Sequence, residues 1–292
     1  MTGELFAILS AASYGIGGYC VAEGARSARG DNGMYLSVLM TCAVTLVLWL
    51  AFGSAGLPEV LSPGGHWAML LFVLAGVFSM VVGRLLNYRA TALIGAVSTS
   101  LYRRLVPVLA VPVAFLMLSE VPEVQVLAGG ALILMAVLLG VSRKGGAAGA
   151  LGGHGLAIGS AAGYALALGF RRLGLMDLPD PMLGTFVGAI TGLLWFTAAA
   201  ALRRDRAEAL SRLFRDLGPW QFAGAAALTA GQTLQFFALR DAEVTLVAVL
   251  AALDVFFTAG LVALAPRGRS RPALRVWLGA VLALAGTAIV LT

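Results

Sequence analysis

The chain of 292 residues is far more apolar than a soluble domain: 60% of its residues are hydrophobic, 12% are charged, and its mean hydropathy is +0.93. Charged residues make up about a quarter of an ordinary soluble domain, so this composition excludes a soluble globular protein and indicates an integral membrane protein. The net charge of +6 would suggest nucleic-acid binding in a soluble chain. Here the basic residues lie mostly in short loops between apolar segments, which argues against that function.

Ten apolar segments are long enough to cross a bilayer, which takes about 20 helical residues. In chain order they span 3–22, 34–54, 67–89, 93–118, 122–141, 154–172, 182–202, 219–239, 243–265 and 273–291. They predict an all-α membrane protein with ten transmembrane helices, five in each half. A Gly- and Ala-rich stretch at 146–153 is interpreted as a linker between a first unit, 1–145, and a second unit, 154–292.

The two units repeat each other in sequence. The eight residues Ala7-Ile8-Leu9-Ser10-Ala11-Ala12-Ser13-Tyr14 match Ala157-Ile158-Gly159-Ser160-Ala161-Ala162-Gly163-Tyr164. At nearly the same offset, Gly83, Asn87, Tyr88 and Ala90 correspond to Gly231, Gln235, Phe236 and Ala238, and Gly130 corresponds to Gly279. Because each unit has an odd number of predicted crossings, the second unit must be inverted relative to the first. Inverted repeats are typical of secondary transporters, whose binding site lies at the repeat interface.

The basic residues predict the orientation in the membrane. Thirteen follow the first, fifth, seventh and ninth segments: Arg26, Arg29, Arg143, Lys144, Arg203, Arg204, Arg206, Arg212, Arg215, Arg267, Arg269, Arg271 and Arg275. The opposite side has three: Arg171, Arg172 and Arg240. Since basic loops stay in the cytoplasm, the first group is predicted to be cytoplasmic, with both termini outside, in a multi-pass protein of the cell's inner (plasma) membrane.

Charged side chains inside apolar segments are the strongest candidates for function, because each costs about 2.5–3.5 kcal/mol at the centre of a membrane helix. Arg103 and Arg104 lie well inside the fourth segment and are predicted near the midplane. A polar stripe follows one face of this helix, with Arg103 at its centre. The other members of the stripe are Thr99, Ser100 and Pro107. Pro107 is predicted to break the helix and let one half gate, since Pro removes a backbone hydrogen bond.

The third segment carries a second polar face, with Arg84 one helical turn from Asn87 and Tyr88. The corresponding residues of the second unit are Gln232, Gln235 and Phe236. Two interpretations of Arg84 stay open: it lines a cavity, or it snorkels to the membrane surface. In the first case the cavity is more positive on the wall formed by the first unit.

An ordered set of short motifs ends the first unit: Asn87-Tyr88-Arg89-Ala90, Ser98-Thr99-Ser100-Leu101, Pro107, Leu118-Ser119-Glu120 and Gly129-Gly130-Ala131-Leu132-Ile133-Leu134. The second unit repeats the set as Phe236-Phe237-Ala238-Leu239, Leu253-Asp254-Val255 and Gly279-Ala280-Val281-Leu282. The order and spacing resemble the EamA-type repeat of the drug/metabolite transporter superfamily. Tyr14, Ser119 and Val255 depart from the Trp, Gly and Pro usual there. The resemblance implies a ten-helix transporter with a cavity between its units, and it does not name the cargo.

Asp254 in the ninth segment corresponds to Val106 of the first unit. In the family fold, helices four and nine lie close together, so Asp254 is expected either to pair with Arg103 or Arg104 or to carry a coupling proton. One carboxylate cannot neutralise two arginines. The remaining positive charge would suit an anionic group of a substrate, because Arg binds carboxylate or phosphate through two parallel hydrogen bonds.

Five tyrosines lie on helices that line the cavity in this family: Tyr14, Tyr19, Tyr164, Tyr88 and Tyr102. Tyr14 and Tyr164 occupy equivalent positions in the two units, which sets them apart from ordinary packing or interfacial tyrosines. Two roles stay open for the set, hydrogen bonding to a substrate and an aromatic cage for a quaternary cation.

No pattern in the sequence predicts catalysis, a cofactor or a metal site, so we expect neither an enzyme nor a cofactor. His66 and His154 have no Cys, Asp or Glu at ligand spacing. Cys20 and Cys42 fall inside apolar segments, which indicates packing residues. There is no nucleophile elbow, phosphate-binding loop or pair of midplane carboxylates.

The sequence therefore predicts a secondary active or facilitative transporter that moves a small metabolite by alternating access, with an anionic group bound by Arg103 and Arg104. The expected partners are the small-molecule substrate, the lipid bilayer and, in one interpretation, protons; we expect no nucleic acid and either a monomer or a homodimer. Two alternatives stay open. One is an exporter of cationic or aromatic drugs or quaternary amines with a tyrosine-lined cavity. The other is a non-transporting membrane scaffold subunit, which would fill the interface between the units with Leu and Phe where a transporter leaves it hollow and polar.

Overall fold

A computed structural model describes residues 2–29, 31–94, 102–140, 151–264 and 274–291, and within these ranges every regular element is a helix. The first half contains α1 (Thr2–Gly24), α2 (Met34–Phe52), α3 (Leu57–Leu61), α4 (Pro63–Gly76), the π-helix η1 (Val77–Gly83), α5 (Arg84–Ile94), α7 (Val106–Leu118) and α8 (Val124–Gly140). The second half contains α9 (Leu151–Asp177), α10 (Pro181–Ala201), α11 (Arg206–Leu213), α12 (Pro219–Asp241), α13 (Val244–Ala251), α14 (Asp254–Leu264) and α15 (Leu274–Val290).

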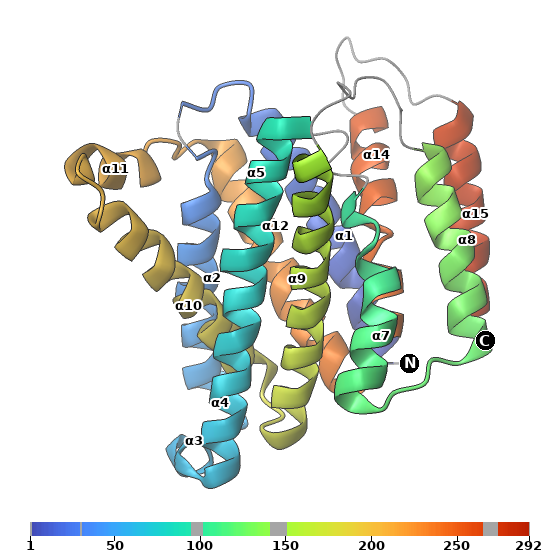
Figure 1. The fold of residues 1–292 in the computed structure, drawn as a ribbon, viewed down its shortest axis with the longest axis horizontal. Helices are drawn as coiled ribbons and strands as arrows, with labels where there is room; N and C mark the ends of the chain where they lie inside the picture. The colour runs from blue at the N-terminus through green and yellow to red at the C-terminus, as the bar shows by residue number, and fades with distance from the viewer. Residues whose placement is uncertain (1, 30, 95–101, 141–150, 265–273, 292) are drawn as a thin grey trace.

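Five stretches of helix are long and apolar enough to cross a membrane: Thr2–Gly24, Met34–Phe52, Pro63–Asn87, Pro181–Ala201 and Val244–Leu264. Three shorter apolar helices accompany them: Val106–Leu118, Val124–Ala136 and Val281–Val290. The all-helical, multi-pass character predicted from the sequence is thereby confirmed. The long helices α9 and α12 are more polar than these five, and they stand in the middle of the bundle (Figure 1). Polar side chains on central helices face protein or a cavity and not lipid.

The helices of the two halves alternate in space along the bundle. α1 packs on α12, and α9 packs on α4, η1 and α5; α2 packs on α10, α7 on α13, and α8 on α15. Each of these contacts joins one helix of the first half to one of the second. The start of α1 and the end of α15 lie at the same end of the bundle (Figure 1). The two halves therefore pack extensively against each other.

Two pairs of equivalent residues in the sequence repeat, Ser10 with Ser160 and Tyr14 with Tyr164, contact the opposite half. The Ser10 hydroxyl donates a hydrogen bond of 2.7 Å to the carbonyl of Gly231, and the Ser160 hydroxyl donates one of 2.6 Å to the carbonyl of Gly83. The Tyr14 ring covers Gly231, where a Cβ would lie 3.1 Å from the ring, and the Tyr164 ring covers Gly83 at the same 3.1 Å. Glycine at both positions allows the close helix approach that these contacts require.

Two helices are interrupted at equivalent positions. α7 begins at Val106 after a turn at Arg104 and Leu105, and α14 begins at Asp254, the repeat counterpart of Val106, after a turn at Ala252 and Leu253. The sequence predicted a break at Pro107 within one continuous helix. The structure interrupts this helix at Arg104 and Leu105, just before Pro107, which lies in the first turn of α7, where its missing N–H needs no partner. Pro112 is the proline inside α7.

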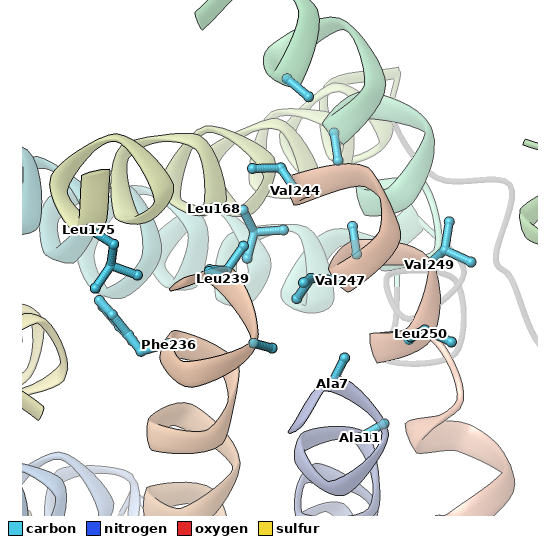
Figure 2. Packing of buried hydrophobic residues seen from close by; sticks show 14 of the residues in the cluster. Ala7, Ala11, Leu168, Leu175, Phe236, Leu239, Val244, Val247, Val249 and Leu250 are labelled. Atoms are coloured by element: carbon cyan, nitrogen blue, oxygen red, sulfur yellow. The ribbon is translucent and has the colours of Figure 1, made fainter. Parts of the chain in front are cut away.

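The apolar core lies at the end of the bundle where α1 starts and where α12 turns into α13; we call this the α12–α13 end. Gly3 of α1 lies there against Ala242, with a Cβ at Gly3 only 2.7 Å from that of Ala242. Figure 2 shows side chains from α1, α9, α12 and α13 meeting in this core: Ala7, Ala11, Leu168, Leu175, Phe236, Leu239, Val244, Val247, Val249 and Leu250. The connection between α1 and α2 lies at the opposite end (Figure 1), which we call the α1–α2 end.

Candidate functional site

A cavity of about 600 Å³ lies inside the bundle. Side chains from both halves line it, and they come from α1, α2, η1, α5, α7, α9, α12, α13 and α14. At one end the lining includes Asp31, Asn32 and Gly33 of the α1–α2 end. At the other end it includes Leu168 and Ala248, which also belong to the apolar core. The cavity therefore runs from the α1–α2 end to a floor made by the core.

Asp254 and Arg104 form an ion pair of 2.7 Å in this cavity, with side chains 26% and 19% exposed. Arg104 lies in the turn before α7, and Asp254 is the first residue of α14. A carboxylate at a helix N-terminus also interacts favourably with the helix dipole. Of the two partners considered for Asp254, the structure selects Arg104, and the ion pair joins the two interrupted helices.

Two further arginines line the cavity and lie over aromatic rings. The guanidinium carbon of Arg103 is 5.4 Å from the centre of the Tyr164 ring, and that of Arg84 is 5.7 Å from the centre of the Phe196 ring. Such contacts favour a cation by about 0.5–2 kcal/mol and leave its charge uncompensated. Among the residues that the structure describes, neither arginine has a carboxylate within 4.0 Å.

A fourth arginine, Arg171, is the most deeply buried cation of the cavity, with 6% exposure. Its Nη1 donates a hydrogen bond of 2.6 Å to Oε1 of Gln235, and its guanidinium carbon lies 4.9 Å from the centre of the Phe236 ring. The Tyr14 hydroxyl donates a longer bond, 3.4 Å, to the same Gln235 oxygen. Neutral groups thus hold this cation, and no described carboxylate lies within 4.0 Å of it.

The sequence predicts Arg171 among the basic residues of the outer side, because it lies one residue before the end of the sixth apolar segment at 172. α9 continues to Asp177, so that Arg171 falls inside the helix. Helical spacing was the signal that could have found it: Arg171 lies three residues from Leu168 and seven from Tyr164, on one helix face. Both of those residues line the cavity.

Four buried N–H donors of the lining residues have no acceptor among the described atoms: Arg84 Nη1, Arg104 Nε, Arg171 Nε and Gln232 Nε2. Each such group costs about 1–3 kcal/mol. The charged lining residues are four arginines and two aspartates, Asp31 and Asp254. Asp31 is engaged by the backbone N–H groups of Gly33 and Tyr35 at 3.1 and 2.7 Å, and burial raises its pKa although these bonds oppose the shift. The cavity is therefore positive and rich in donors.

Comparison with known proteins gives the family. Residues 1–142 match the model of the EamA-like transporter family. The match places the chain in the drug/metabolite transporter superfamily. A solved structure described only as "Crystal structure of protein" shares the fold of this transporter with a TM-score of 0.74, covering 98% of this chain and 94% of that chain at 17% identity. No curated protein matches the chain.

Most of the residues predicted for the site line the cavity of this drug/metabolite transporter: Tyr14, Arg84, Arg103, Arg104, Pro107, Tyr164, Gln232, Gln235 and Asp254. Tyr102 is not among its lining residues; its hydroxyl lies 2.9 Å from Nδ1 of His154. Thr99 and Ser100 lie outside the described residues, as does the side chain of Tyr88 on α5. The sequence did not single out Arg171, nor the hydroxyl and indole groups that α2, η1 and α12 contribute: Ser37, Thr41, Ser79 and Trp220.

At the α12–α13 end, a half-buried arginine, Arg172, bonds several segments together. Its Nε lies 3.3 Å from Oε1 of Glu120, and its Nη1 donates to the carbonyls of Leu239 and Arg240 at 2.8 and 2.6 Å. The other oxygen of Glu120 accepts a bond of 3.0 Å from the Val244 N–H at the start of α13. These bonds, which we call the Arg172 latch, connect the first half to three segments of the second.

Proposed function

We propose that the chain is a secondary transporter of a small solute that carries an anionic group, bound in the cavity between its two halves. The family match supports a membrane transporter of small solutes. The anionic character rests on one observation: Arg84, Arg103 and Arg171 line the cavity without a carboxylate partner among the described residues. A buried charge without a partner is costly, and this applies most to Arg171, which is 6% exposed, whereas Arg84 is half-buried and Arg103 is exposed. A carboxylate or phosphate of the solute would compensate these charges.

The proposed transport unit has ten membrane helices in two inverted repeats of five. From the first half these are α1, α2, the stretch of α4, η1 and α5, the helix that contains α7, and α8. From the second half they are α9, α10, α12, the pair α13 and α14, and α15. Three observations support the repeat: the exchanged contacts of Ser10 and Ser160, those of Tyr14 and Tyr164, and the two helix interruptions at equivalent positions. Discontinuous helices at the repeat interface are a known feature of binding sites in secondary transporters.

Transport would proceed by alternating access, with the structure in the state whose cavity reaches the α1–α2 end. The apolar core and the Arg172 latch close the α12–α13 end. The α1–α2 end carries basic residues of the predicted cytoplasmic group, among them Arg26 and Arg29. By the positive-inside rule this state faces the cytoplasm of an inner-membrane protein whose termini are outside. Opening to the other side then requires separation of Arg172 from Glu120.

The hollow, polar interface supports transport over a scaffold, which would fill the same space with apolar side chains. The four arginines of the lining also oppose a cation as the cargo, since two aspartates cannot neutralise them. Asp254 remains proposed as either a fixed partner of Arg104 or a carrier of a coupling proton. Both roles begin from the 2.7 Å ion pair.

The test is a thermal-shift screen of the detergent-purified protein against inorganic phosphate, succinate and benzoate, beside choline and tetraethylammonium. A ligand at 100 times its Kd stabilises the folded state by about 2.7 kcal/mol. We expect stabilisation by one or more of the anions, reduced in Arg103→Gln. The control Arg203→Gln removes an arginine that pairs with Asp205 at the surface and should behave as wild type. Stabilisation by the cations alone would contradict the proposal.

A further inference from the structure

We propose that Arg171 is the residue that holds the anionic group of the solute, a carboxylate or a phosphate, and that Gln235 and Tyr14 position its guanidinium. The inference rests on the proposed function, because it assumes that the cavity binds an anion. It shifts the main anion contact from Arg103 and Arg104, which the sequence favoured, to a residue of α9.

Burial sets Arg171 apart from the other three arginines. Its side chain is more than nine-tenths buried, and it lines the deep part of the cavity beside Leu168. Its described neighbours are neutral: the Gln235 amide, the Phe236 ring and the Tyr14 hydroxyl, which bonds the same Gln235 oxygen. Arg104, in contrast, has its charge met by Asp254. Arg171 is therefore the cation with most to gain from an anion, because desolvation makes an uncompensated charge expensive.

The hydrogen bonds of Arg171 leave one edge of the guanidinium for a ligand. Nη1 is occupied by Gln235 and the face of the group by Phe236, whereas Nε has no acceptor. Because the bond that Nη1 donates to Gln235 fixes the plane of the guanidinium, the Nε edge is oriented before any ligand arrives. A planar carboxylate or a phosphate accepts from such an edge with good geometry.

A second donor without a described acceptor lies one helical turn from Gln235, the residue that bonds Arg171. Gln232 is 7% exposed, its Nε2 has no described acceptor, and it stands one helical turn from Gln235 on α12. Residues three apart on a helix present neighbouring side chains, with Cβ atoms about 5–6 Å apart. An anion has several acceptor oxygens, so that one ligand can satisfy both Arg171 and Gln232.

The repeat supplies an internal control for this assignment. The counterpart of Arg171 in the first half is Val21, which also lines the cavity. The proposed anion-binding site is thus present once, in the second half. The protein is expected to bind one anion per chain at this position.

The experiment measures the Kd of the full-length, detergent-purified protein for inorganic phosphate and succinate in four forms: wild type, Arg171→Gln, Arg103→Gln and Val21→Gln. Loss of charge-assisted hydrogen bonds should weaken binding about 10- to 100-fold in Arg171→Gln. Val21→Gln should change the Kd by less than about 3-fold. Arg103→Gln should weaken binding by a smaller factor than Arg171→Gln, because Arg103 is exposed and Arg171 is buried. The melting temperature of the ligand-free Arg171→Gln protein should rise, because an unpaired buried charge is removed; an arginine with a purely structural role would give a lower melting temperature.

Affinity for these anions within 3-fold of wild type in Arg171→Gln would overturn the assignment. Should that variant fail to fold, Arg171→Lys decides: it keeps the charge without the planar edge, and its affinity is expected to fall about 10-fold, so that unchanged affinity would overturn the assignment. Anion binding that is lost in Arg103→Gln and kept in Arg171→Gln would refute the role of Arg171 and would leave the proposed function unchanged. A wild-type protein that binds neither anion, nor benzoate, would refute both.

Discussion

The two halves of the molecule agree in the residues that pack them together and differ in the residues that carry charge. Ser10 and Ser160 make the same hydrogen bond across the interface, and the rings of Tyr14 and Tyr164 cover equivalent glycines. At five other pairs of positions one half is charged and the other is not: Val21 and Arg171, Arg84 and Gln232, Arg103 and Ala251, Arg104 and Ala252, Val106 and Asp254. All ten of these residues line the cavity.

This difference shows how one fold can combine packing contacts that are equivalent in the two halves with a binding site that is not symmetric. The symmetric contacts hold the two halves against each other, and they do not depend on which solute is bound. The charged positions need no symmetry, because the solute itself has none. A binding site for one anion follows naturally from departures of one half from the other.

The largest effect is expected where the asymmetry creates an ion pair. Asp254→Asn leaves Arg104 without its carboxylate in a partly buried place, and we expect a loss of about 1–3 kcal/mol in the free energy of unfolding. The double variant Arg104→Gln/Asp254→Asn should regain most of that loss, because no charge is left uncompensated. Thermal unfolding of the single and double variants forms a double-mutant cycle. Strictly additive losses would show that the two side chains do not interact.

Equal losses are expected where the halves agree. Gly83→Val and Gly231→Val would each push a tyrosine ring away from the opposing helix, and overpacking of this kind costs about 1–3 kcal/mol. Gly260→Val is the matched control, since a Cβ there meets nothing within 4 Å. Melting temperatures of the three variants check the prediction. A Gly83 variant as stable as the control would show that the contact between Tyr164 and Gly83 does not stabilise the packing of the two halves.

A smaller effect on stability, with a clear effect on conformation, is expected at the closed end. Glu120→Gln replaces the charged partner of Arg172 with a neutral one and should cost about 1–2 kcal/mol. It should also populate the state that is open at the α12–α13 end. Leu175→Cys, a buried core position, reports this opening through its labelling rate with a polar maleimide after Cys20 and Cys42 are replaced by Ala. Equal labelling rates with and without Glu120→Gln would show that the Arg172 latch does not hold this end closed.

The smallest effects are expected at the exchanged hydroxyls. Ser10→Ala and Ser160→Ala each remove one hydrogen bond to a glycine carbonyl and should cost about 0.5–1.5 kcal/mol. The two values should agree with each other, and Ser27→Ala, whose bond stays within its own loop, should cost less. Chemical unfolding in detergent measures all three. A large difference between Ser10 and Ser160 would show that the halves are not held by equivalent contacts.

Many of the membrane helices and of the contacts between the halves could be predicted from the sequence, because local sequence patterns indicate them. The length of the apolar segments indicated the membrane helices. The repeated stretch that ends in Tyr14 and in Tyr164 contained the residues that make equivalent contacts between the halves. Asp254 and Arg104 stood out because a charge inside an apolar segment is costly wherever it points.

The remainder depends on contacts between distant segments. Helix α13 ends before Asp254 without a proline to announce it, so the interruption follows from the packing of α13 and α14 and not from their sequence. Arg171 lies near the end of an apolar run, where hydropathy cannot distinguish the last turns of a helix from a loop. Its burial becomes visible once α12 brings Gln235 and Phe236 against it.

The most direct test of the account compares two ligands of equal length and opposite charge. Isothermal titration calorimetry of the purified wild-type protein would measure the binding of succinate and of 1,4-diaminobutane, with inorganic phosphate as a competitor. The account predicts that anions bind, that succinate and phosphate compete for one site per chain, and that the diamine does not bind. Binding of the diamine with no measurable binding of either anion would contradict it.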